Sequence, residues 1–140
     1  MATRRRQLPG TGTEAQIQRT ILDGLAAKGI FSFRINTGGF GGSHKGKRWF
    51  VRPHSLGAGC ADILAFPVMK QFSACQNCDE RYQEESVYPT WIECKTDKGE
   101  LSAEQASFRL KVTALGHGHL VARSWDDVQK YLDDLDDEIV

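Results

Sequence analysis

The sequence has no long hydrophobic run. Within its 140 residues, no apolar stretch approaches the roughly 20 residues that a membrane-spanning helix requires. The chain begins with basic residues at Arg4, Arg5 and Arg6, but no apolar segment follows them. That absence excludes a secretory signal and a twin-arginine export signal. We therefore predict an intracellular, cytoplasmic protein that makes no contact with a membrane.

Cysteine is also scarce, and its four positions form no convincing disulfide framework in a cytosolic chain of this size. Cys94 is expected in the core as a small hydrophobic side chain. Cys75-x2-Cys78 is half of a zinc-binding pattern, and no second pair follows it. Zinc at Cys75 and Cys78 would need a partner chain or a histidine to complete the site; otherwise the segment is a reduced surface turn. The histidines are His44, His54, His117 and His119.

The rest of the composition is typical of a soluble globular domain. The chain is 40% hydrophobic and 26% charged, and it is long enough for one domain with a real core. Its formal net charge of zero hides an asymmetry, because residues 1–53 carry ten Lys or Arg against two acids. Residues 125–140 carry one Lys against seven acids. The basic first third suits contact with a polyanion, although charges on any solvated surface give a similar pattern.

The order of sequence patterns predicts one α/β domain. Residues 1–12 are expected to form a flexible basic arm, and 13–140 a single domain with an insertion at 67–86. Helices are predicted over 13–28, 102–115 and from Ser124 onward, with Thr13, Ser102 and Ser124 as N-caps. Strands are predicted over 30–36, 47–53, 61–66, 87–95 and 119–123, with a glycine-rich loop over 37–46. We expect a mixed central β-sheet flanked by helices.

Two of the predicted strands contain carboxylates. Asp62 lies in one apolar run and Glu93 in another, and a buried carboxylate needs a partner. Side chains alternate along a strand, so Glu93 and Lys95 share one face while Cys94 points to the other. Asp62 beside them would supply the second carboxylate of a cation site, with the Lys95 amine within reach.

This residue set suits hydrolysis of a phosphodiester with a divalent metal. Mg²⁺ or Mn²⁺ would take oxygen ligands from Asp62, Glu93 and the Cys94 backbone carbonyl. Lys95 would orient a water or offset charge on the phosphate. The alternative interpretation is an ordinary ion pair between Glu93 and Lys95 on one face of a strand.

Taken together, these motifs resemble the virus-type replication-repair nuclease (VRR-NUC) family of the PD-(D/E)XK nuclease superfamily. The resemblance covers roughly residues 13–132. It rests on Glu14, the segments 59–62, 92–95 and 99–105, and a C-terminal stretch that includes 121–124 and 126–128. It implies a restriction-endonuclease-like core and a structure-selective endonuclease that acts on branched DNA such as a flap or four-way junction. Small members are typically phage or bacterial, and the family includes homodimers.

The resemblance also implies roles for individual residues. Asp62, Glu93 and Lys95 match the catalytic set, with Glu14 and Gln105 assisting at the metal or the phosphate. Each of the last two has a simpler interpretation. An acid in the first turn of a helix interacts favourably with the helix dipole, and Gln105 fits a capping box with Ser102.

The glycine-rich loop and the strand after it carry a cluster of cations. Gly41-x4-Gly46-Lys47 approaches a phosphate-binding P-loop, but Arg48 stands where Ser or Thr must bind magnesium. We expect contacts with a DNA backbone instead. The residues concerned are Lys45, Lys47, Arg48 and Arg52.

We therefore predict a Mg²⁺-dependent endodeoxyribonuclease, with two rival hypotheses. One is a non-catalytic DNA-binding module on the same fold, which would not need Asp62, Glu93 and Lys95. The other is a zinc-stabilised interaction protein, whose metal content would reveal it.

Overall fold

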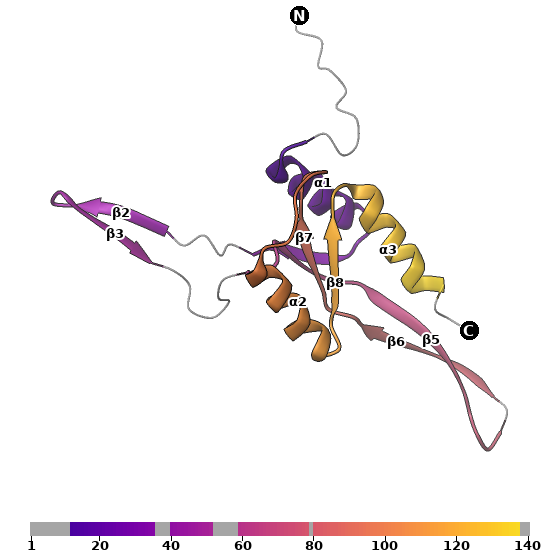
Figure 1. Cartoon of the computed structure of the whole chain (residues 1–140). Coiled ribbons are helices and arrows are strands. Elements are labelled where there is room, and N and C mark those ends of the chain that lie inside the picture. Colours follow the sequence, from indigo (N-terminus) through magenta and orange to yellow (C-terminus); the bar gives the residue numbers. More distant parts are fainter. Residues whose placement is uncertain (1–11, 36–39, 52–58, 79, 138–140) are drawn as a thin grey trace, which may run out of the picture.

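A four-stranded mixed sheet forms the centre of the protein (Figure 1). The structure is a computed structural model that describes residues 12–35, 40–51, 59–78 and 80–137. The strand order is β1-β4-β7-β8, with β7 and β8 parallel and the other two pairs antiparallel. The strands are β1 (Phe31–Arg34), β4 (Ile63–Phe66), β7 (Thr90–Cys94) and β8 (Gly118–Ala122). The predicted α/β class with a mixed sheet and flanking helices is confirmed.

Two helices cover one face of this sheet. They are α1 (Glu14–Ala27) and α3 (Trp125–Asp137). The apolar stripe of α1 and Val128 of α3 are buried against alternate residues of β4 and β7. Thr13 caps α1 as predicted, and Leu132 and Leu135 of α3 are partly exposed. None of the described helices is long and apolar enough to span a membrane.

The third helix, α2 (Ala103–Ala114), connects the parallel strands β7 and β8 and lies on the opposite face of the sheet. The ring of Phe108 packs edge-on against Trp91 of β7, with 5.1 Å between the ring centroids. The predicted Ser102 cap and its capping box with Gln105 are both present. Val112 alone in this helix is buried, while Leu110 of the predicted apolar stripe is 72% exposed.

Part of the predicted glycine-rich loop is a strand, and it forms a hairpin with the strand that we predicted over 47–53. β2 (Phe40–His44) pairs with β3 (Lys47–Val51) in a sheet of its own. Lys45 and Gly46 connect the strands with positive φ values of 49° and 75°. Two consecutive residues with positive φ give the tight turn whose twist matches that of two paired strands. Glycine content was a misleading signal here, because half of the predicted loop is strand.

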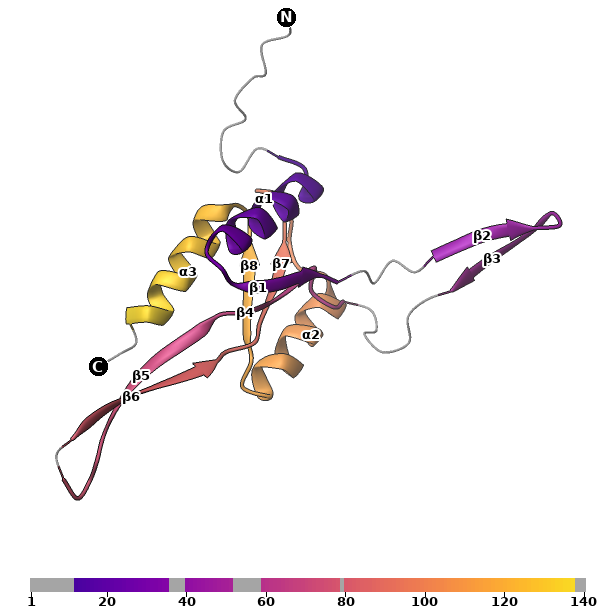
Figure 2. The same ribbon diagram turned by 180° about the vertical axis from the view of Figure 1, so that it is seen from behind.

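The predicted insertion is a second hairpin. β5 (Val68–Ala74) pairs with β6 (Arg81–Val87) along seven residues of each strand. This two-stranded ribbon extends away from the central sheet in both views (Figures 1 and 2).

Two of the predicted strand limits were wrong. The predicted strand over 87–95 is shorter, because Val87 ends β6 and Pro89, which has no backbone N–H, stands just before β7. Asp62 lies in a bend one residue before β4 instead of within the strand.

Candidate functional site

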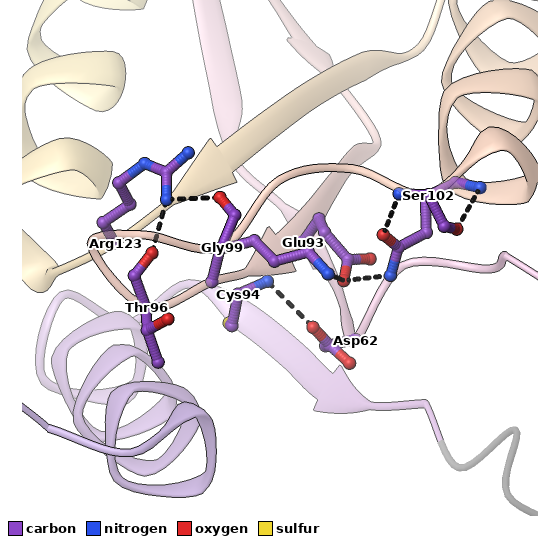
Figure 3. A network of polar contacts seen from close by, with 9 residues as sticks. Asp62, Glu93, Cys94, Thr96, Gly99, Ser102 and Arg123 are labelled. Atoms are coloured by element: carbon purple, nitrogen blue, oxygen red, sulfur yellow. Dashed lines mark hydrogen bonds and ion pairs between the residues drawn. The ribbon is translucent and has the colours of Figure 1, made fainter.

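Asp62 is held at the end of the sheet by its own backbone. Its N–H donates to the Ile92 carbonyl (3.1 Å), and its carbonyl accepts from the Ile35 N–H (2.7 Å). Because the chain bends at Asp62, β4 does not extend far enough to pair with Cys94 of β7. The Asp62 carboxylate takes that place, and its Oδ2 accepts a 2.8 Å hydrogen bond from the Cys94 N–H (Figure 3). The aspartate is thereby fixed beside β7.

Glu93 lies in the middle of this arrangement and is only 3% exposed. Its Oε1 accepts a 2.8 Å hydrogen bond from the Gln105 side-chain amide. The same oxygen lies 3.8 Å from the Lys95 ammonium nitrogen. The strand alternation predicted for Glu93 and Lys95 is confirmed, and the structure brings Asp62, Glu93, Lys95 and Gln105 together.

Gln105 forms the predicted capping box and also contacts Glu93. Its Oε1 accepts from the Ser102 N–H at 2.9 Å, which completes the capping box of α2. Its Nε2 donates to Glu93. One amide group therefore ties the start of α2 to the buried carboxylate, because its acceptor and donor atoms point in different directions.

The surroundings of Glu93 favour its protonated form. Burial above all, and then the nearby Asp62 carboxylate, which also hydrogen-bonds to it, raise the pKa of Glu93 to about 8. Lys95 opposes this rise, and Glu14 adds to it. Two carboxyl groups this close favour a shared proton or a cation between them.

A divalent cation fits this set of atoms. The N–H and carbonyl of a strand residue point to the same edge, so the Cys94 carbonyl faces the edge where its N–H meets Asp62. Asp62, Glu93 and that carbonyl supply the oxygen ligands that Mg²⁺ or Mn²⁺ prefers. Among the described residues no group of three or more His, Cys, Asp or Glu side chains is placed to hold a metal ion. Two carboxylates and one carbonyl would leave the remaining positions around an octahedral cation to water and substrate.

Of the charged residues that influence the pKa of Glu93, Glu14 has the smallest effect. It is the first residue of α1 and is exposed to solvent. Its charge reaches the site, since it raises the pKa of both Glu93 and the Cys94 thiol. Glu14 therefore influences the site through its charge while its side chain is exposed to solvent.

Arg123 is a supporting residue to which sequence reasoning gave no role. Its guanidinium Nη1 donates to the carbonyls of Thr96 and Gly99, the latter at 2.8 Å (Figure 3). These carbonyls belong to the loop between Lys95 and α2. A charged donor that binds two carbonyls fixes this loop, and with it the direction in which Lys95 leaves β7.

Gly59 is a second supporting residue, three positions before Asp62. A side chain at this position would place its Cβ 2.3 Å from the backbone carbonyl carbon of Glu104. Its φ of +83° is also a conformation that favours glycine. The segment that carries Asp62 therefore packs directly on the first turn of α2, one residue from Gln105.

The predicted DNA-binding cations are spread over the β2–β3 hairpin. Lys45 lies in its turn, while Lys47 and Arg48 are adjacent in β3 and so point to opposite faces. All three are exposed. Arg52 and the arm over 1–11 lie outside the described residues.

The four cysteines fall into two pairs with different surroundings. Cys60 and Cys94 are buried next to the carboxylates, and burial, with the Asp62 and Glu93 charges, raises the pKa of the Cys60 thiol to about 11. Cys75 and Cys78 lie at the turn of the β5–β6 ribbon. There the Cys78 side chain and the backbone N–H groups of Asn77 and Cys78 lower the pKa of Cys75.

The pKa of Glu93 predicts how stability depends on pH in the absence of divalent cations. Between its ordinary value of 4.5 and about 8, the folded chain retains a proton that the unfolded chain has released. Burial lowers the pKa of His119 to about 4, so below about pH 6.5 this group changes stability in the opposite direction. Above pH 6.5 the free energy of unfolding should therefore fall as the pH rises to about 8, by roughly 2 kcal/mol. Urea unfolding in EDTA at a series of pH values measures this change.

Glu93→Gln should flatten this pH profile, because the neutral amide has no proton to lose. Glu84→Gln, at an exposed position of β6, is the matched control and should keep the slope of the parent. An equal slope in the parent and in Glu93→Gln would show that another group carries the titration.

No protein-family model, curated protein or solved structure matches this chain.

Proposed function

We propose that the protein is a metal-dependent DNA endonuclease with a restriction-endonuclease-like core of the PD-(D/E)XK type, similar to the VRR-NUC family. The observation that carries this proposal is the convergence of Asp62, Glu93 and Lys95 at one end of the sheet. Glu93 is buried, tied to α2 by Gln105 and raised in pKa by its neighbours. A simple ion pair on the face of a strand requires none of these features.

Each site residue has a definite part in this proposal. Asp62, Glu93 and the Cys94 carbonyl would hold Mg²⁺ or Mn²⁺, which when bound polarises the phosphate and lowers the pKa of a water. Lys95, 13% exposed, presents its ammonium group beside Glu93 and offsets negative charge that builds up on the phosphate oxygens. Gln105 orients Glu93, and Glu14 adds negative charge that favours a cation.

Contacts with DNA are assigned to the exposed cations of the β2–β3 hairpin, Lys45, Lys47 and Arg48, together with Arg52. These cations lie at a turn and on both faces of a two-stranded ribbon. They therefore suit a DNA groove or branch point, where phosphate groups lie on more than one side of the protein. A small domain with a single site cuts one strand. A two-fold homodimer therefore suits a symmetric four-way junction, in which two strands must be cut.

The rival function is a DNA-binding module without catalysis. Incubation with linear, flap and four-way DNA, with Mg²⁺, with Mn²⁺ or with EDTA, separates the two. We expect cleavage that requires the cation and is fastest on a branched substrate, measured on denaturing gels with each strand labelled in turn. Binding without cleavage of any of the three in either metal would favour the rival.

A further inference from the structure

The β5–β6 ribbon is exposed over most of its length. Every residue of β6 is exposed, as are large side chains on both strands, with Phe72 54% and Tyr82 48% exposed. A two-stranded hairpin without further packing is only marginally stable in water. The ribbon therefore needs a stabilising contact in addition to its own backbone hydrogen bonds. The residues at its tip can provide one.

The two cysteines of the tip are arranged as a chelating pair. The Cys75 N–H donates to the Glu80 carbonyl at 2.8 Å, which continues the β ladder to the start of the turn. Interactions with the Cys78 side chain and with the backbone N–H groups of Asn77 and Cys78 lower the pKa of the Cys75 thiol. The two thiols are therefore close enough to influence each other, and the backbone dipoles of the turn support negative charge on Cys75.

Two sulfurs provide half of a structural zinc site, which takes four ligands in a tetrahedron. Among the described residues, no third Cys, His, Asp or Glu joins this pair to form a metal-binding group. The tip points away from the central sheet (Figure 2). The Nδ1 of His117, just before β8, already accepts a hydrogen bond from the Trp91 indole. A second copy of the chain would bring an identical pair of sulfurs as the other two ligands.

We propose that Cys75 and Cys78 of two copies of this chain bind one zinc ion, which joins the tips of their β5–β6 ribbons through four cysteine sulfurs. A two-fold axis through the metal supplies the missing pair without any further residue type. A projecting ribbon lets two tips meet while the bodies of the protomers stay apart. Arg81, paired with Ala74 next to Cys75, brings a positive charge close to the four thiolates. The zinc site shares no residue with the proposed nuclease site.

The metal content of the full chain tests the proposal directly. After purification under reducing conditions with zinc and removal of loosely bound metal, elemental analysis should give one zinc per two chains. Light scattering should give the mass of a dimer, which falls to that of a monomer when a strong chelator removes the zinc. Because two chains share one metal ion, the conversion of dimer to monomer should depend on protein concentration.

Cobalt replacement identifies the ligands. Co²⁺ in place of zinc should show the visible absorption and the thiolate charge-transfer bands of a tetrahedral four-sulfur site. Cys75→Ser and Cys78→Ser should each abolish these bands, the bound zinc and the dimer. Gln76→Ser, in the same exposed turn, is the matched control and should keep all three. Circular dichroism of the variants confirms that the central domain remains folded.

Other outcomes overturn the proposal. One zinc per chain in a monomer would mean that the ligands come from within the chain. Zinc that persists in Cys75→Ser would belong to the Asp62 and Glu93 site. An absence of zinc under reducing conditions, with a Cys75–Cys78 disulfide after oxidation, would assign the pair to redox chemistry.

Discussion

Asp62→Asn and Lys95→Ala are expected to reduce metal-dependent DNA cleavage at least about 100-fold while leaving the fold intact. Asn at position 62 keeps an oxygen that can accept from the Cys94 N–H, so it removes the charge without removing the hydrogen bond. Lys95→Ala removes the only ammonium group observed next to Glu93 in the described part of the chain. Single-turnover cleavage with saturating enzyme measures the effect on the chemical step apart from DNA binding.

The neighbouring loop supplies matched controls. Asp97→Asn and Lys98→Ala change the same residue types at exposed positions just after Lys95. They should cleave within a few-fold of the parent, and all four variants should bind DNA with similar affinity in EDTA. Cleavage at the parent's rate by both Asp62→Asn and Lys95→Ala would place the active site elsewhere.

Gly59→Ala is expected to cost about 3 kcal/mol or more in the free energy of unfolding and to reduce cleavage at the same time. Two effects combine at this position. A β-carbon strains the backbone at φ +83°, and it overlaps the Glu104 carbonyl group at 2.3 Å. Because the clash involves backbone atoms, relief requires the first turn of α2 to move. That movement displaces Gln105 from Glu93.

Gly116→Ala separates these two effects. Gly116 has nearly the same φ, +81°, but no atom lies within 4 Å of the position that a β-carbon would take. Its replacement should cost only the backbone strain, about 1–2 kcal/mol, and leave cleavage unchanged. Unfolding in urea and the cleavage assay together measure the difference between the two variants. Equal losses at both positions would show that the contact between Gly59 and α2 does not position the site.

The secondary structure of the core was predictable because its signals are local. The Thr13 and Ser102 caps, the apolar spacing of α1 and the strand alternation around Glu93 each involve residues a few positions apart. Strand β2 and the β5–β6 hairpin were missed for the same reason. A glycine-rich segment and a polar insertion lack the apolar alternation of a half-buried strand, and pairing with the adjacent strand decided their conformation.

The sequence by itself determined which residues form the candidate site and roughly where each element lies, including the buried Glu93 and its neighbour Lys95. Only the tertiary structure decided how these groups meet. It brings the Gln105 amide to Glu93, packs Gly59 on the backbone of α2 and carries Arg123 to the carbonyls of Thr96 and Gly99. Contacts between elements depend on how helices and strands pack. The spacing and composition of residues within a short segment do not show how that segment packs against the others.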